Sequence, residues 1–553
     1  MTFIQSAAEL GNQFRDDRVL RAQLERSLPV AVREAITPEL DELGAHAAAA
    51  WHRERERSAR EPHLTQWDSQ GRRVDRLELT PAWHEARDIA ARFGLVAAGH
   101  EDTYAEHGRI DQFARVYLHH VASAFFTCPL AMTDGAATCL KAAANPELCT
   151  RTLPRYLSRD PARFWISGQW MTETPGGSDV GDSETAARQD STGQWRLYGR
   201  KWFTSAVQAD TALALARVDG AGTGADALTL FYLEPRDADG AWRDLVINRL
   251  KPKLGTRELP SAETELLGVA ATPVAGLGHG VRAIAPMLNV TRSWNAVCAI
   301  ATMRRAIALA RDYAHKRRAF GRRLIEHPLH QTTLASMQAD FEGAFQLTFH
   351  VIVLLGRVQH GKADTTEATL LRLLTPLAKL WTGKLAVSIC SEAIECLGGA
   401  GYIEDSGLPQ LLRDAQVLPI WEGTTNVLSL DVLRVLRNPA ALAAWRSSID
   451  ALLDAVASSL QPAVATLRAD VEARCARLAM LATEPQRLEA AAREVALCLA
   501  RDFAAALLLR QADWSLRHGD GTRAAAARRF IARCATAPAT YDLADDALLA
   551  ADE

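Results

Sequence analysis

The hydrophobic pattern of the chain changes character twice along its length, and this order of patterns limits the folds available to it. Apolar residues follow helical spacing in residues 1–165, whereas residues 166–275 carry short strand-compatible runs bounded by Gly, Asp and Pro. Helical spacing returns in residues 276–440 and continues through an Ala- and Arg-rich stretch, residues 441–553. A chain of 553 residues also exceeds a single hydrophobic core. We therefore predict an α+β protein with an N-terminal helical domain, a small β domain, a helical bundle and an additional C-terminal helical domain, bounded as above.

Local signals mark element ends in the first part. Thr37-Pro38 and Thr80-Pro81 each predict a helix start, with a hydroxyl at the N-cap and proline at the first helical position. Gly94 then stands where a helix end is expected. Between these signals, Ser69-Gln-Gly71 predicts a turn.

The strand and helix predictions rest on short periodic segments. Residues 195–198, 211–216 and 227–233 are expected to be strands of the β domain. Residues 300–315 and 367–390 are expected to be helices of the bundle. In the last part, apolar residues recur every four positions and predict a further helix: Val495, Leu499, Phe503 and Leu507.

The overall charge gives no sign of a nucleic-acid binder. The formal net charge is -3 and the sequence pI is near 6.6, so any such role would need a local basic patch. Residues 523–533 contain a local cluster, Arg523, Arg528, Arg529 and Arg533, in a domain that has two more acids than arginines. This cluster is either a phosphate-binding face or the solvated face of a packing domain.

Cysteine and histidine usage predicts reduced thiols and no metal site. The nine cysteines are scattered without a CxxC pair, and the fifteen histidines show no HExxH spacing. The N-terminal segment carries acids early and lacks an apolar signal region, and no apolar run approaches the ~20 residues of a membrane span. We expect a cytoplasmic protein that does not cross a membrane.

Pro419-Ile-Trp-Glu-Gly-Thr-Thr-Asn426 places one carboxylate in an unusual setting. Glu422 stands between the bulky Trp421 and the flexible Gly423, which makes it a candidate catalytic base. The alternative is an ordinary helix start with Glu in the first turn.

Two upstream segments have the composition of a flavin pocket. In Met171-Thr-Glu-Thr-Pro-Gly-Gly-Ser-Asp-Val180, glycines allow close backbone approach and hydroxyls supply hydrogen bonds. Gly199-Arg-Lys-Trp-Phe-Thr-Ser205 follows at short distance. Either segment alone could be no more than a turn or a strand.

Two further segments could bind phosphates. The basic run His315-Lys-Arg-Arg-Ala-Phe-Gly-Arg-Arg323 is either a solvated helix end or a phosphate site. Glu395-Cys-Leu-Gly-Gly-Ala-Gly-Tyr402 reads as a helix C-cap followed by a loop, or as a glycine-rich turn that receives a pyrophosphate.

Taken together and in this order, these motifs resemble the acyl-CoA dehydrogenase superfamily of flavoproteins. The resemblance implies bound FAD, an acyl-CoA substrate and α,β-dehydrogenation, in which Glu422 removes the α-proton while the β-hydrogen leaves as hydride. It also implies a set of cofactor-binding residues: Met171, Thr172, Gly177, Ser178, Trp202, Thr204, Arg317, Phe320, Glu395, Gly398, Gly399, Trp421, Gly423, Thr424 and Asn426. Some members use a carboxylate on an earlier helix as the base, but that position is Thr291 here.

The resemblance also implies partners. Arg317 and Phe320 match a motif that reaches the FAD of a neighbouring subunit, so a homotetramer built as a dimer of dimers is expected, with electron-transfer flavoprotein as electron acceptor. The chain departs from the usual pattern at Ala319, where a Thr is common, and at Glu395, where a Gln is common.

Residues 60–440 and the C-terminal extension resemble one branch in particular, the adaptive-response flavoproteins of DNA alkylation damage. That branch implies a DNA-associated protective role as the second hypothesis, which the acidic balance of residues 441–553 disfavours. An acyl-CoA oxidase, which also carries an extra helical domain, is the third. We rank the dehydrogenase first.

Overall fold

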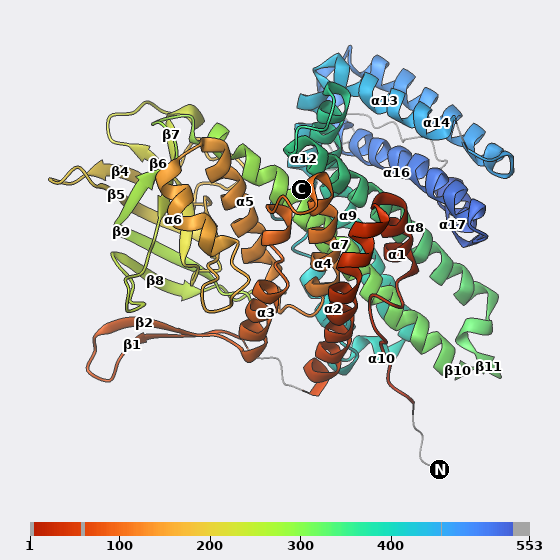
Figure 1. The fold of residues 1–553 in the computed structure, drawn as a ribbon, viewed down its shortest axis with the longest axis horizontal. Coiled ribbons are helices and arrows are strands. Elements are labelled where there is room, and N and C mark those ends of the chain that lie inside the picture. The colour runs from red at the N-terminus through yellow and green to blue at the C-terminus, as the bar shows by residue number, and fades with distance from the viewer. Residues whose placement is uncertain (1–4, 57–60, 455, 535–553) are drawn as a thin grey trace, which may run out of the picture.

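The N-terminal part is helical and carries one β-hairpin. The computed structural model describes residues 5–56, 61–454 and 456–534. Its first part contains α1 (Arg18–Ser27), α2 (Val30–Glu56), α3 (Pro81–Arg92), α4 (Gly108–His120), α5 (Thr127–Ala143) and α6 (Pro146–Tyr156), and the hairpin is β1 (His63–Trp67) with β2 (Arg73–Glu78). In Figure 1 this hairpin extends beneath the β domain.

The predicted caps are confirmed at one site and wrong at the other. Thr80 is the N-cap of α3 and accepts a hydrogen bond from the Trp83 N–H at 3.2 Å, and Gly94 (φ +58°) follows the end of that helix. Pro38, in contrast, lies inside α2, because that helix already begins at Val30. The Thr37 hydroxyl donates back to the Arg33 carbonyl at 2.7 Å and caps nothing.

The central part is a seven-stranded sheet that closes on itself. Its strands are β3 (Ser167–Trp170), β4 (Ala186–Gln189), β5 (Trp195–Ser205), β6 (Thr211–Val218), β7 (Leu228–Leu233), β8 (Leu245–Leu250) and β9 (Ser261–Pro273). The order is β3-β6-β4-β5-β9-β7, with β8 on β9, and the additional pairing of β6 with β7 closes the ring. The three predicted strands are therefore confirmed within β5, β6 and β7. Leu197, Phe231 and Val269 are among the side chains that fill the interior.

The third part is a bundle of long helices. It contains α7 (Gly280–Lys316), α8 (Pro328–Gln359), α9 (Thr365–Leu397), α10 (Gly399–Tyr402), α11 (Leu408–Ala415) and α12 (Thr425–Leu436), with the short strands β10 (Arg318–Ala319) and β11 (Arg322–Arg323) after α7. Within the described residues, α8 alone is long and apolar enough to span a membrane by length and composition. Since 78% of its apolar window is buried inside the protein, α8 is a core helix of this bundle.

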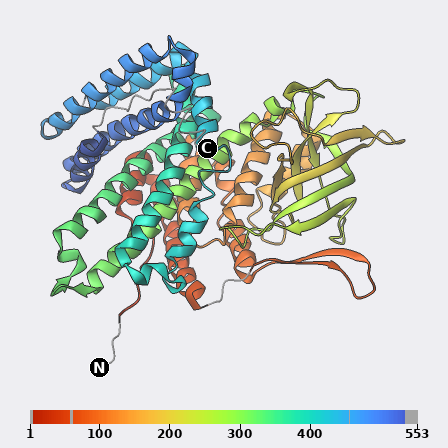
Figure 2. The same cartoon turned by 180° about the vertical axis from the view of Figure 1, so that it is seen from behind.

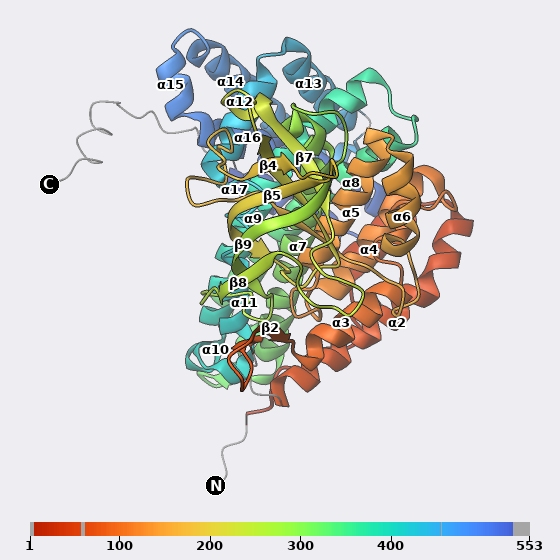
Figure 3. The ribbon, with the colours of Figure 1, turned by 90° about the vertical axis from the view of Figure 1, so that its left-hand side faces the viewer.

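The last part packs on the bundle at the side away from the sheet (Figure 2). It consists of α13 (Pro439–Leu453), α14 (Gln461–Leu481), α15 (Pro485–Ala490), α16 (Ala492–Arg517) and α17 (Thr522–Cys534). The predicted four-residue repeat lies on α16, where Leu499, Phe503 and Leu507 are buried. In Figure 3, α13, α14 and α15 lie at one end of the bundle and α10 at the other.

Candidate active site

Glu422 lies in a turn that forces an uncommon backbone conformation. Its φ is +56°, in the left-handed region that non-glycine residues rarely adopt, and Gly423 follows at φ +104°. Helix α12 begins only at Thr425, with Thr424 as N-cap, so Glu422 precedes the helix and the interpretation as a first-turn residue is wrong. Backbone strain of this kind costs about 1–3 kcal/mol and clusters at functional sites.

Helix α7 contacts this turn with successive polar side chains. The Thr291 hydroxyl donates to Glu422 Oε2 at 2.6 Å, and Arg292 Nε donates to the Glu422 carbonyl at 3.4 Å. One turn further along α7, Asn295 Oδ1 accepts a hydrogen bond from the Trp421 indole. Thr291, which stands where some family members carry their base, is therefore in direct contact with the Glu422 carboxylate.

Helix α9 contributes a residue that sequence reasoning missed. Lys379 is fully buried, and its Nζ donates to the Gly423 carbonyl at 2.6 Å. A signal was present, because this lysine interrupts the apolar run Leu377-Ala-Lys-Leu380. A lone charge on the buried face of a core helix needs a partner.

The electrostatics of this turn move two pKa values toward neutrality. Burial raises the pKa of Glu422, and the Thr291 hydroxyl, Arg292 and Lys379 oppose that rise. Burial lowers the pKa of Lys379 to about 7, against the attraction of Glu422. A general base works best when its pKa is close to the working pH, so the direction for Glu422 suits that role.

The predicted flavin segments meet in the β domain. The loop after β3 and the end of β5 are joined by a hydrogen bond from the Trp202 N–H to the Thr172 carbonyl, at 2.9 Å. Beside it, buried Lys201 donates to Glu173 at 2.6 Å, and Thr204 shares a hydrogen bond with Thr264 at 2.8 Å. These contacts hold the loop that contains Met171 and Thr172 against the end of β5.

The loop of residues 171–178 is tightly folded and partly exposed. A Cβ placed on Gly177 would come within 3.0 Å of the Thr172 side chain, so the loop is tight here. Gly177 and Ser178 are exposed, whereas Trp202 is half-buried. Their backbone and hydroxyl groups are thus accessible to a cofactor.

The two predicted phosphate segments lie elsewhere. Arg317 caps the end of α7, and Phe320, with φ +49°, is 96% exposed. Glu395, Gly398 and Gly399 are exposed where α9 ends. In Figure 1, β10, β11 and α10 lie at the lower end of the bundle, well away from β5. One chain therefore does not bring these residues to the loop of residues 171–178.

Trp294 of α7 and Trp421 of the catalytic turn have different surroundings. Trp294 is a core residue, and its buried indole donates to Asp134 Oδ2 at 2.7 Å. Trp421 is half-buried and its ring lies 5.7 Å from that of Phe125. Phe125 in turn lines a cavity of about 590 Å³ together with His120 and Thr302.

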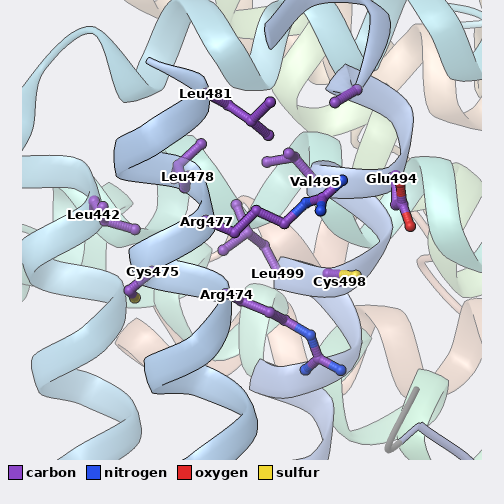
Figure 4. Close-up of a pocket in the computed structure, with 11 residues that line it drawn as sticks. Leu442, Arg474, Cys475, Arg477, Leu478, Leu481, Glu494, Val495, Cys498 and Leu499 are labelled. Carbon is purple, nitrogen blue, oxygen red and sulfur yellow. The ribbon is translucent and has the colours of Figure 1, made fainter. Parts of the chain in front are cut away.

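A second cavity lies in the last domain, between α14 and α16 (Figure 4). Its walls are mainly apolar, with Leu478, Val495 and Leu499 among them. None of its lining residues belongs to the Glu422 turn or the flavin segments. Across the described residues, no group of three or more His, Cys, Asp and Glu is placed to hold a metal ion.

Three of the four clustered arginines are engaged in docking α17 on α8. Arg523 is buried and paired with Glu342, which is also buried. Arg529 donates to the Thr332 carbonyl at 2.9 Å, and Arg533 lies 3.1 Å from Asp340. Arg528 is exposed. Three of these four arginines thus help to pack α17 on α8, whereas the sequence indicated a phosphate-binding face or a solvated face.

Models of known domain families match the chain in succession. They are described as adaptive response protein AidB N-terminal domain (residues 5–160), acyl-CoA dehydrogenase, middle domain (168–269), acyl-CoA dehydrogenase, C-terminal domain (278–437) and acyl-CoA dehydrogenase 11 C-terminal domain-like (440–542). The predicted fold class and order of parts are thereby confirmed.

Similar proteins span most of the chain. Acyl-CoA dehydrogenase family member 11 of Caenorhabditis elegans is 42% identical, over 92% of this chain and 85% of its own length. The putative acyl-CoA dehydrogenase AidB of Escherichia coli is 36% identical, over 69% and 70%. The crystal structure of Caenorhabditis elegans ACDH-11 in complex with C11-CoA superposes with a TM-score of 0.95 at 39% identity, covering 100% of this chain and 97% of that one.

Proposed function

Because the chain belongs to the acyl-CoA dehydrogenase family of enzymes, we propose that it oxidises an acyl-CoA thioester between its α- and β-carbons, with FAD as cofactor and Glu422 as base. The observation that carries this proposal is the Glu422 turn, in which a carboxylate with a raised pKa is held by α7 and α9. The relative solved with C11-CoA supports a fatty acyl-CoA as the substrate class.

The residues of the chain divide the work in a definite way. FAD, when bound, supplies the hydride acceptor. Glu422 Oε accepts the α-proton, and Thr291 holds that carboxylate by its hydroxyl. The Glu422 backbone N–H is the donor that would polarise the thioester carbonyl as negative charge develops.

Several residues are proposed to hold the cofactor. Met171, Thr172, Trp202 and Thr204 would contact the flavin ring, with the exposed Gly177 and Ser178 beside its phosphates. Trp421, Gly423, Thr424 and Asn426 would border it from the catalytic turn. Both sets are accessible at least in part, apart from Thr204, which is buried beneath the sheet surface.

A second copy of the chain is proposed to complete each site. Arg317, Phe320, Glu395, Gly398 and Gly399 are partly or fully exposed at one end of the bundle, far from the flavin loop of their own chain. We propose that they reach the FAD of a partner in a dimer of dimers. Electron-transfer flavoprotein as acceptor and a cytoplasmic location complete the proposal.

The DNA-associated alternative draws on the AidB match at residues 5–160 and on the AidB relative. The engagement of Arg523, Arg529 and Arg533 in packing weakens it, since these charges are already paired or hydrogen-bonded. We therefore keep the dehydrogenase as the primary function.

Anaerobic titration with a panel of acyl-CoAs tests this proposal. The FAD-loaded protein should lose its flavin absorbance with at least one member of the panel. Retention of the oxidised spectrum with every chain length would reject the dehydrogenase and the oxidase together. Slow recovery of the spectrum in air would favour the dehydrogenase over the oxidase.

A further inference from the structure

A lysine ammonium buried in an apolar core is expensive, and Lys379 is such a group. Its side chain is fully inside the protein, on α9, between buried Ala378 and Leu380. Removing an ammonium from water costs several kcal/mol unless hydrogen bonds and an opposite charge compensate. A leucine at this position would avoid the cost, so we expect a role that requires the ammonium.

The contact that Lys379 makes is with the catalytic turn. Nζ donates to the Gly423 carbonyl at 2.6 Å, directly after the base in sequence. Glu422 and Gly423 both have positive φ, at +56° and +104°, and Thr424, the N-cap of α12, follows them. The Gly423 carbonyl therefore lies between this constrained turn and the helix. The lysine therefore fixes the segment whose conformation aims the Glu422 carboxylate.

The charges around Lys379 leave Glu422 as its anionic neighbour. From α7, Arg292 also faces the turn, but Arg292 is paired with Asp431 at 2.9 Å. Asp431 is shared with Arg372 at 2.7 Å and Arg434 at 3.5 Å, so its negative charge is fully engaged. Cys128, whose pKa burial raises above its ordinary range, is the further titratable group near Glu422 and stays neutral.

We propose that Lys379 is a positioning residue for the base: its ammonium clamps the Gly423 carbonyl and supplies the positive charge that keeps Glu422 ionised until the α-proton arrives. This inference rests on the proposed role of Glu422. A positive charge near a carboxylate favours the ionised form, which is the form that can accept a proton. The clamp itself uses a backbone carbonyl, so it persists after Glu422 becomes neutral.

Two substitutions separate the clamp from the charge. Lys379→Gln keeps a neutral N–H donor and removes the charge, whereas Lys379→Met removes both. Lys379→Arg keeps the charge. Lys384→Met is the matched control, because Lys384 lies on the same helix and is exposed.

The first readout needs no turnover. The Glu422 carboxyl is titrated by pH-difference infrared spectroscopy of the FAD-loaded protein, and Glu422→Gln identifies its band. Lys379→Gln and Lys379→Met should raise the midpoint by about one pH unit or more. Lys379→Arg and Lys384→Met should leave it near the wild-type value.

The second readout is the pH dependence of flavin reduction. At neutral pH, Lys379→Gln should lower kcat about tenfold with little change in KM, and the acid limb should move to higher pH. Lys379→Arg, which stays charged, should leave the acid limb near its wild-type position.

The outcomes are distinguishable from failure of the proposed function. If no acyl-CoA reduces the wild-type flavin, the dehydrogenase proposal fails, and the infrared titration still decides the role of Lys379. An identical Glu422 midpoint in wild type and Lys379→Gln overturns the inference. If Lys379→Met does not fold, the Gln and Arg variants carry the test.

Discussion

At the residue scale, the candidate chemistry depends on a few side chains that come from distant parts of the chain. The Glu422 carboxylate accepts a hydrogen bond from Thr291 of α7, and the Gly423 carbonyl accepts one from Lys379 of α9. The hydroxyl at Thr291 stabilises the carboxylate, whereas burial destabilises it. The balance between these two effects sets the pKa of Glu422 and hence the fraction of the protein in which it can accept a proton.

Removal of the Thr291 hydroxyl should shift this balance. Thr291→Val keeps the shape but leaves the carboxylate without that donor, so the pKa of Glu422 should rise further. A hydrogen bond to a charged group contributes about 1.5–3 kcal/mol, so flavin reduction at neutral pH should slow by roughly tenfold or more. Ser293→Ala is the control, since its hydroxyl bonds the Asn289 carbonyl. An unchanged pH profile in Thr291→Val would contradict the assigned contact.

The cost of burying the charged Glu422 carboxylate should also lower the free energy of unfolding. Because its pKa is raised in the folded state, ionisation costs folding free energy, and this cost grows as pH rises above the pKa of the unfolded chain. Glu422→Gln should therefore raise Tm at about pH 8. The gain should vanish at about pH 3, well below the pKa of ~4.3 of an unfolded glutamate, where the wild-type carboxyl is neutral in both states. A gain that is equal at both pH values would point to a cause other than ionisation.

At the element scale, the last domain is tied to the bundle by buried charge as well as by apolar packing. Arg523 from α17 pairs with Glu342 from α8, and both side chains are buried. Arg529 and Arg533 continue the contact along α8. The basic cluster of residues 523–533 therefore lies mostly in the contact between α17 and α8, which we call the α17–α8 seam.

Loss of one partner should destabilise this seam. Arg523→Met leaves the Glu342 carboxylate buried without its cation, which typically costs about 3–5 kcal/mol. Arg528→Met, at the exposed neighbouring position, should cost little. Urea unfolding of the two variants compares them directly, and equal midpoints would show that the buried pair contributes nothing.

The sequence predicted elements better than it predicted the contacts between them. Capping at Thr80 and Gly94 was readable because it depends on neighbouring residues. The prediction of a helix start at Thr37-Pro38 was wrong because proline can also lie inside a long helix. Here Pro38 lies within α2, and the Thr37 hydroxyl donates to the Arg33 carbonyl one turn earlier. Glu422 was found through the resemblance of its motif. The hydrogen bond from Lys379 to the carbonyl of the next residue, Gly423, spans 44 residues and could not be read from spacing.

At the scale of the whole molecule, one end of the helical bundle carries exposed apolar side chains. Phe320 is 96% exposed on a turn with positive φ, and Tyr402 and Ile403, at the end of α10, are also exposed apolar side chains. Large apolar groups gathered at one end of a protein indicate an interface. The arrangement agrees with a site shared between two copies of the chain.

Substitution in this region should loosen the cofactor. Arg317→Ala should weaken FAD retention by about 10–100-fold, which is the loss of one charge-assisted contact of about 1.5–3 kcal/mol. Arg322→Ala, in the β10–β11 hairpin that follows Arg317, is the control. Light scattering of the wild type should give a dimer or tetramer, and a monomer that holds FAD fully would rule out the shared site.

The central claim, that Glu422 is the base for acyl-CoA oxidation, is tested most directly by anaerobic rapid mixing of wild type and Glu422→Gln with the best acyl-CoA of the panel. The account predicts that both proteins bind FAD and that the flavin of the variant is reduced at least ~10²–10⁴-fold more slowly. Reduction of the Glu422→Gln flavin at close to the wild-type rate would contradict it.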